Sequence, residues 1–224
     1  MASRFYFGAR TVVRPLVRLA WNPRVTGMEN VPREGGFIIA SNHLANIDSF
    51  VIPVVFPRQV RFVAKDTLWA HQGIKGSVLR WFFDAVGAVP VDREALSSGK
   101  GALQAALEIL REGSGFGIYP EGARSKDGLL HPGKQGAAWL ALESGCPVIP
   151  VGLKGTQHLF TTAIPERGTV SVRVGEPLDI ADVDPSLSKG VRRRVMNARI
   201  MDEIQKLSGQ RRSPEPTSSA RSEF

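Results

Sequence analysis

Short apolar runs alternate with segments of helical periodicity over most of the chain. The apolar runs predict strands at 36–40, 60–64, 88–91, 115–119, 148–153 and 169–174. Between them, apolar residues recur three and four positions apart. This spacing predicts helices at 48–56, in the later part of 68–85, and at 102–110, 135–143 and 185–207. Because strands separated by helices favour parallel pairing, the pattern predicts an α/β fold with a mostly parallel central sheet flanked by helices.

The N-terminal segment has a different pattern. In a helix over residues 4–21, the arginines at every fourth position form one row, and most apolar residues fall on another face. The row is Arg10, Arg14 and Arg18, and the apolar face holds Phe5, Val12, Leu16 and Leu19. This is typical of an amphipathic helix in a membrane interface, although a helix packed on the domain would look similar. Pro15 would kink such a helix or mark its first turn.

Composition predicts three parts along the chain. We expect an interface helix over 1–24, one domain over 25–207 and a disordered tail over 208–224, which is rich in Ser, Pro, Arg and Glu. The sequence contains neither an apolar run long enough to span a bilayer nor a secretory signal. The predicted location is therefore the cytoplasm or the cytoplasmic face of a membrane.

Charge and cysteine content narrow the function classes. The 224 residues include 29 Lys and Arg against 21 Asp and Glu, a net charge of +8 that favours anionic partners. Nucleic acid, acidic lipid and phosphorylated small molecules all meet that description. The single cysteine, Cys146, excludes an internal disulfide framework and a cysteine-based zinc site.

A histidine and an aspartate follow the first predicted strand, in the segment SNHLANID. If the turn is tight, Asp48 can accept a hydrogen bond from one ring nitrogen of His43 and leave the other free to take a proton. With no cysteine near and Ser41 too close to pair with the histidine, this favours a base acting on a bound hydroxyl. The alternative is that Asp48 caps a helix and His43 is an ordinary loop residue.

Two further segments place an arginine just past a predicted strand. They are GAVPVDR, which ends at Arg93, and YPEGARS, which contains Glu121, Gly122 and Arg124. Arginine suits phosphate because its planar fork donates two parallel hydrogen bonds, and a glycine lets backbone approach a ligand closely. Alternatively, Arg93 pairs with a neighbouring acid and Glu121 is only a structural anchor.

Taken together, these motifs resemble those of a known family. NHxxxxD, GxxxVDR, YPEGxRS and VIPV occur in this order over roughly residues 25–180, as in the glycerolipid acyltransferases, which include the 1-acylglycerol-3-phosphate acyltransferases. The resemblance implies that His43 is the catalytic base and Asp48 its orienting partner. It also implies a set of residues that bind the acceptor and its phosphate: Lys65, Arg93, Glu121, Gly122 and Arg124.

The implied reaction moves an acyl group from acyl-CoA or acyl carrier protein to the sn-2 hydroxyl of lysophosphatidic acid. No cofactor and no metal are implied, and the protein would associate peripherally with the anionic cytoplasmic face of the membrane. One position departs from the pattern: Ala123 stands where the family usually has threonine, which removes a hydroxyl contact to the acceptor.

Three alternatives remain at this stage. The same chemistry could act on another acceptor: glycerol 3-phosphate, a lysophospholipid or a lyso-aminolipid. A non-catalytic lipid-binding relative would keep the fold without the reaction. A nucleic-acid-binding module would interleave aromatic residues with Lys and Arg or show a docking motif; the sequence has neither, so we expect no nucleic-acid partner.

Overall fold

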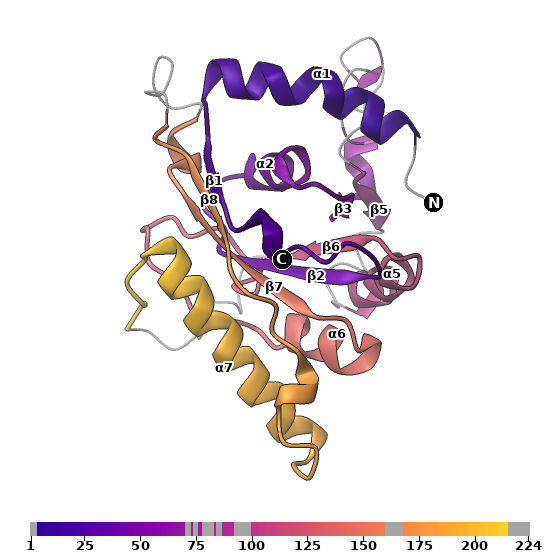
Figure 1. The fold of residues 1–224 in the computed structure, drawn as a ribbon, viewed down its shortest axis with the longest axis vertical. Coiled ribbons are helices and arrows are strands. Elements are labelled where there is room, and N and C mark those ends of the chain that lie inside the picture. The colour runs from indigo at the N-terminus through magenta and orange to yellow at the C-terminus, as the bar shows by residue number, and fades with distance from the viewer. Residues whose placement is uncertain are drawn as a thin grey trace.

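A six-stranded sheet forms the centre of the protein. The computed structural model describes residues 4–69, 73, 76–77, 83, 87–91, 100–159 and 168–214 (Figure 1). The strand order is β1 (Arg24–Thr26), β8 (Ser171–Val174), β7 (Val148–Lys154), β2 (Phe37–Ser41), β6 (Gly115–Ile118) and β3 (Val60–Arg61). Every neighbouring pair is parallel except β7 with β8. The predicted α/β fold with a mostly parallel sheet is confirmed.

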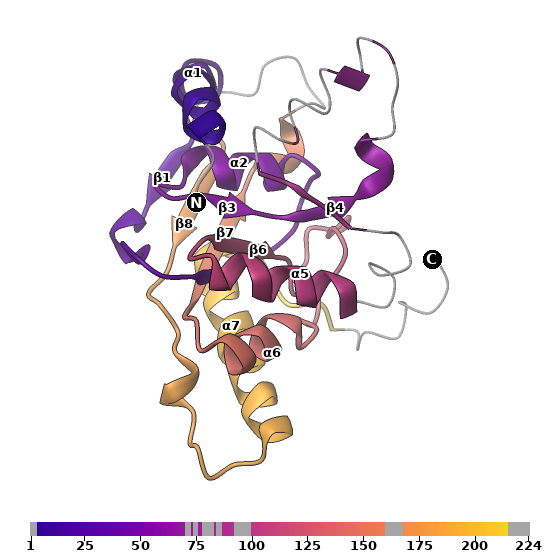
Figure 2. The same ribbon diagram turned by 90° about the vertical axis from the view of Figure 1, so that its right-hand side faces the viewer.

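Helices cover both faces of this sheet. On one face lie α5 (Lys100–Arg111), α6 (Gly136–Ser144) and α7 (Lys189–Ser208), and on the other lies α2 (Asp48–Val55) (Figures 1 and 2). Single 3₁₀ turns occur at Met28–Asn30, Asp66–Trp69, Thr156–His158 and Ile180–Asp182. Most of the segment 68–85, where a helix was expected, lies outside the described residues.

The alternation of side chains along β2 builds two hydrophobic cores. Ile38 and Ala40 face α5, α6 and α7, whereas Phe37 and Ile39 face α2. All four are fully buried. A strand buried on both faces has a continuous apolar sequence, as the run at 36–40 does.

The run expected as one strand at 60–64 is divided at Phe62. β3 belongs to the main sheet, whereas β4 (Val63–Lys65) pairs in parallel with β5 (Val89–Val91) in a separate two-stranded sheet. The Phe62 carbonyl accepts a hydrogen bond from the N–H of Val89 at 2.8 Å. Its ring packs over β6 at Gly117, where a Cβ would lie 2.1 Å from a ring carbon. The ring therefore fits only because residue 117 is glycine.

The expected N-terminal helix is present as α1 (Arg4–Ala20), which lies over α2 (Figures 1 and 2). Val17 packs against the domain and is 6% exposed, whereas Leu16 and Leu19 are 58% and 70% exposed. These three apolar residues of α1 are thus divided between the domain and the surface. Within the described residues, none of the helices is both long and apolar enough to cross a bilayer.

Residues 208–214, which composition predicts to be disordered, include a segment that is hydrogen-bonded to the domain. α7 ends at Ser208, and the chain then runs beside Leu130, whose N–H donates to Arg211 O at 2.8 Å. The N–H of Ser213 donates back to Leu130 O at 2.9 Å. Polar composition concealed this order, because the segment is held by hydrogen bonds rather than by apolar burial. Residues 215–224 lie outside the described part of the chain.

Candidate active site

The motif residues gather at the carboxyl ends of two adjacent strands. His43 lies two residues beyond β2, and Tyr119 follows β6 directly. Because β2 and β6 are hydrogen-bonded in parallel, both ends open at the same edge of the sheet. Loops beyond the carboxyl ends of parallel strands are the usual place for ligands in such folds.

His43 and Asp48 form a hydrogen-bonded pair. The Nδ1 atom of His43 lies 2.9 Å from Oδ2 of Asp48, and Asp48 is fully buried at the start of α2. The same oxygen accepts the backbone N–H groups of Leu44 and Ala45 at 2.7 and 2.8 Å. An ionised Asp48 therefore holds the proton of the imidazole on Nδ1 and leaves a lone pair on Nε2.

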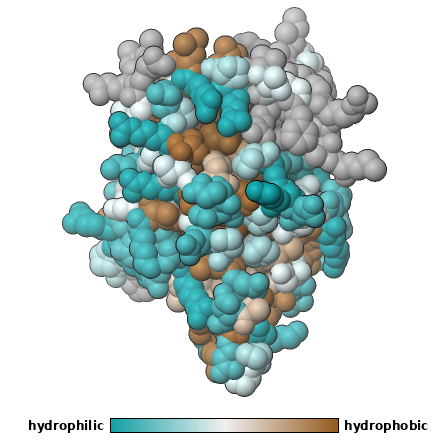
Figure 3. Space-filling view, in the orientation of Figure 1, coloured by the Kyte–Doolittle hydropathy of each residue, from teal (hydrophilic) through white to brown (hydrophobic). Residues whose placement is uncertain are grey.

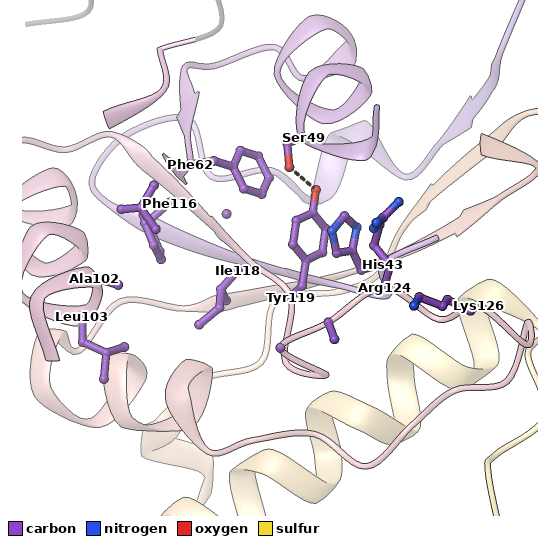
Figure 4. A pocket seen from close by; sticks show the side chains of 14 residues that line it. His43, Ser49, Phe62, Ala102, Leu103, Phe116, Ile118, Tyr119, Arg124 and Lys126 are labelled. Carbon is purple, nitrogen blue, oxygen red and sulfur yellow. Dashed lines mark hydrogen bonds between the residues drawn. The ribbon is translucent and has the colours of Figure 1, made fainter. Parts of the chain in front are cut away.

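The Nε2 atom of His43 has no hydrogen-bond partner among the residues that the structure describes. The His43 side chain is 15% exposed and lines a pocket of about 670 Å³ (Figure 4). A base needs such an open, proton-accepting atom beside the space that holds the reacting group. The pair therefore has the geometry of general-base catalysis.

An aromatic ring fixes the plane of the imidazole. The rings of His43 and Tyr119 are stacked, with centroids 3.9 Å apart and planes 7° from parallel. The phenolic oxygen of Tyr119 is 2.9 Å from Oγ of Ser49 on α2 (Figure 4). Burial, reinforced by the negative charge of Asp48, raises the pKa of Tyr119 well above its ordinary value. The phenol is therefore neutral, and it packs against the imidazole as a hydrogen-bonded ring.

Glu121 connects the two loops of the site. Its Oε1 accepts the backbone N–H of His43 at 3.1 Å, and its Oε2 accepts that of His131 at 3.0 Å. The residue is 5% exposed and does not line the pocket, and burial raises its pKa despite these two hydrogen bonds. Its carboxylate is thus engaged within the protein. This geometry matches an anchor, the alternative that the sequence left open for Glu121.

The loop after Tyr119 presents two cations to the pocket. Gly122, Arg124 and Lys126 all line it, and neither cation has an ion-pair partner among the described residues. Gly122 has φ +74°, and a Cβ there would lie 2.8 Å from Nζ of Lys134. The positive φ therefore favours glycine at residue 122, whereas the flexible end of Lys134 could move away from a Cβ. Ser125 N donates to His43 O at 2.8 Å, which joins this loop to the base.

The pocket has two chemically different ends. Away from the cations its walls are apolar: Phe62, Val63, Ala102, Leu103, Phe116 and Ile118. Figure 4 shows the labelled apolar side chains, among them Phe62, Phe116 and Leu103, on one side of the His43–Tyr119 stack, and Arg124 and Lys126 on the other. A ligand with an anionic head and an apolar tail matches this distribution, and its junction would lie beside Nε2 of His43.

The structure does not describe the side chains of two residues expected at the site. The backbone of Lys65 lies in β4, but its side chain is not described, and Arg93 lies outside the described residues. Three further residues at the pocket were not predicted: Ser49, Tyr119 as a stacking partner, and Lys126. Lys126 follows the third motif by one residue, so its charge was a usable signal. Nothing in the sequence indicates the stack or the Ser49 contact.

Comparison with known proteins decides the family. A model of the family named Acyltransferase matches residues 22–154, more than half of the chain. The chain belongs to the acyltransferase family. The 1-acyl-sn-glycerol-3-phosphate acyltransferase of Bacillus subtilis is 30% identical over 174 residues, which cover 76% of this acyltransferase and 80% of the relative. The protein of that name from Borreliella burgdorferi is 30% identical over 67% of this chain and 58% of its own length.

A solved structure has the same fold. The crystal structure of the 1-acyl-sn-glycerophosphate acyltransferase PlsC from Thermotoga maritima superposes with a TM-score of 0.63 at 26% identity. The match covers 92% of this acyltransferase and 83% of that chain. The similarity of fold therefore extends over most of both chains.

Proposed function

We propose that this acyltransferase moves a fatty acyl group from acyl-CoA or acyl carrier protein to the sn-2 hydroxyl of 1-acylglycerol 3-phosphate, giving phosphatidic acid. The observation that carries the proposal is the open Nε2 of His43 between an apolar and a cationic end of one pocket. The acceptor is an amphiphile of the same polarity, with a phosphate close to the reacting hydroxyl. The relatives named above carry the corresponding activity in their names.

In the proposed reaction, Nε2 of His43 takes the proton of the acceptor hydroxyl as its oxygen attacks the thioester carbonyl. The tetrahedral intermediate then collapses with cleavage of the carbon–sulfur bond, and the imidazolium returns the proton to the leaving thiolate. Asp48 stabilises the imidazolium while it exists. General-base catalysis of this kind contributes about 10²–10⁴-fold to the rate.

Charge and proximity position the acceptor in this proposal. Arg124 and Lys126 neutralise its phosphate, and Arg93 and Lys65 are proposed to join them. Gly122 gives the phosphate room to approach the loop. Binding the phosphate holds the hydroxyl near Nε2 of His43, which replaces a bimolecular encounter with an oriented one.

We further propose that the protein associates peripherally with the cytoplasmic face of the membrane through α1. The exposed Leu16 and Leu19 would enter the interface, and the positive charge of Arg14 and Arg18 would attract α1 to an anionic surface. These arginines are exposed, have no ion-pair partner among the described residues, and border a hollow of about 420 Å³ under α1. Figure 3 shows apolar surface next to hydrophilic side chains over this helix.

An acceptor panel tests the substrate assignment. The purified full chain is incubated with one acyl-CoA and, in turn, lysophosphatidic acid, glycerol 3-phosphate, lysophosphatidylcholine or a lyso-aminolipid, and the products are identified by mass. We expect the highest kcat/KM with lysophosphatidic acid. A higher kcat/KM with any of the others would reassign the acceptor.

A further inference from the structure

The segment after α7 returns to the loops of the candidate active site. We call residues 208–213 the C-terminal strap. Gly209, with φ +72°, reverses the chain at the end of the helix, and Ser208 Oγ accepts the N–H of Gln210 at 3.2 Å. The strap then runs beside Leu130 through the two backbone hydrogen bonds described above. These contacts bring Gln210 between two segments that are far from it in sequence.

Gln210 bridges those two segments with its side-chain amide. Its Oε1 accepts a hydrogen bond from Nδ2 of Asn42 at 2.8 Å. Its Nε2 donates to the carbonyl of Gly128 at 2.9 Å. Asn42 directly precedes His43, and Gly128 lies two residues after Lys126 in the cationic loop. Gln210 therefore contacts both the loop that carries His43 and the loop that carries Arg124 and Lys126.

Asn42 depends on Gln210 for its full set of hydrogen bonds. Asn42 is fully buried. At the end of β7 its side-chain amide takes the place of a neighbouring strand and pairs with the backbone of Leu153. Oδ1 accepts the N–H of Leu153 at 2.7 Å, and Nδ2 donates to Leu153 O at 2.9 Å. The amide has a second N–H, and Gln210 is its acceptor. Without Gln210, a buried donor next to His43 would lose its partner, which proteins rarely tolerate.

From these contacts we propose that Gln210 is a positioning residue for acyl transfer, acting through Asn42 on His43 and through Gly128 on the cationic loop. It does not line the pocket, so it touches neither substrate nor reacting atoms. Its two ends have separate effects. The side-chain carbonyl oxygen of Gln210 holds Asn42 and thereby the position of His43, which affects the chemical step. The amide N–H₂ holds the loop of Arg124 and Lys126, which affects acceptor binding.

Two substitutions separate these effects in the full-length protein. Gln210→Leu has similar volume and removes both hydrogen bonds. We expect kcat to fall about tenfold and the acceptor KM to rise, since each lost hydrogen bond costs about one factor of ten. Gln210→Glu keeps an acceptor for Asn42 but cannot donate to the Gly128 carbonyl. We therefore expect it to raise the acceptor KM while kcat stays within about twofold.

Arg212→Ala is the matched control on the same strap. The Arg212 side chain pairs with Asp202 and Gln205 of α7 and contacts neither loop of the site. We expect its kcat and KM to remain at wild-type values. Asn42→Ala provides the second control: if Gln210 acts on kcat through Asn42, adding Gln210→Leu to Asn42→Ala lowers kcat no further. Additive losses of kcat in the double variant would overturn the proposed route.

Amide hydrogen exchange keeps the inference testable apart from the acceptor assignment, on which its kinetic part rests. Gln210→Leu should accelerate exchange at the Leu130 and His43 N–H groups and leave α5 unchanged. Unchanged exchange together with unchanged kcat and KM in both Gln210 variants would refute the positioning role, even if lysophosphatidic acid proves to be the acceptor. Faster exchange in a protein that acylates a different acceptor would support the role and refute only the substrate.

Discussion

The imidazole of His43 lies face to face with the ring of Tyr119, with 3.9 Å between centroids and 7° between planes. Asp48 fixes one edge of the imidazole, and Tyr119 fixes its plane. Ser49 in turn holds the phenol from α2. The two constraints together determine where the lone pair of Nε2 points, and we expect Tyr119 to affect catalysis only through this orientation.

Removing the stack should slow the chemical step. Aromatic pairs contribute about 0.5–1.5 kcal/mol beyond burial, so Tyr119→Leu should lower kcat about three- to tenfold or more. Tyr119→Phe keeps the ring and loses only the Ser49 contact, so its kcat should stay within about threefold of wild type. Steady-state kinetics on folded variants, checked by thermal unfolding, measure both. Equal kcat in wild type and Tyr119→Leu would contradict a role for the stack.

Removing the cations of the third-motif loop should weaken acceptor binding. A hydrogen bond to a charged group contributes about 1.5–3 kcal/mol, so Arg124→Ala should raise the acceptor KM about 10- to 100-fold. Lys126→Ala should act in the same direction with a smaller effect, because an ammonium lacks the bidentate fork. Exposed Arg111, at the end of α5 and outside the pocket, supplies the control Arg111→Ala.

The readout for these variants is KM for lysophosphatidic acid against KM for acyl-CoA. An Arg124→Ala protein whose acceptor KM matches that of Arg111→Ala would show that the phosphate binds elsewhere. Such a result would direct attention to Arg93 and Lys65.

Buried Glu121 should give stability a specific pH dependence. Burial raises its pKa above the ordinary value of 4.5, so the folded state favours the protonated form. The associated stabilisation is complete below pH 4.5 and is lost as the pH rises through the folded-state pKa. Glu121→Gln does not titrate. We therefore expect the free energy of unfolding of wild type, relative to Glu121→Gln, to fall as the pH rises from 4.5 through the folded-state pKa of Glu121.

Chemical denaturation at several pH values measures this difference. If the advantage of wild type instead grew with rising pH, the two backbone hydrogen bonds would outweigh burial, and the pKa of Glu121 would be lowered.

The exposed leucines of α1 should determine membrane binding. An apolar side chain contributes up to about 1.5–3 kcal/mol when it leaves water, so replacing Leu16 and Leu19 with Ser should weaken vesicle binding at least about tenfold. Leu187→Ser, at another exposed leucine, is the control. Sedimentation with phosphatidylcholine vesicles measures the apolar contribution to binding. Sedimentation with vesicles that contain phosphatidic acid adds the electrostatic contribution. Full binding by the double variant would refute the interface helix.

Sequence periodicity predicted those parts of the fold that apolar burial determines. The runs at 36–40, 115–119 and 148–153 became the adjacent strands β2, β6 and β7, because strands buried on both faces carry continuous apolar sequence. β1 was missed because it has three residues, two of them exposed. The division at Phe62 was missed because it depends on space above Gly117, which is a tertiary property.

The candidate site likewise combines features that local sequence predicts with features that depend on tertiary contacts. The spacing of His43 and Asp48 was informative, because a five-residue interval can close a local turn. Contacts between distant segments could not be predicted from spacing. The partners Glu121 and His43, Tyr119 and Ser49, and Gln210 and Asn42 are each 70 or more positions apart in the sequence. Such contacts leave no periodic trace in the sequence. Polar composition predicts disorder for the strap for this reason, because hydrogen bonds rather than buried apolar residues hold it against the domain.

Acyl transfer by a His43→Ala variant tests the central claim most directly. Purified wild type, His43→Ala and the control His158→Ala, at an exposed histidine outside the pocket, are given lysophosphatidic acid and acyl-CoA, and phosphatidic acid is quantified by mass. We predict that His43→Ala remains folded and loses about 10²–10⁴-fold in kcat, whereas His158→Ala keeps the wild-type rate. A folded His43→Ala protein that makes phosphatidic acid at the wild-type rate would contradict the assignment of the base.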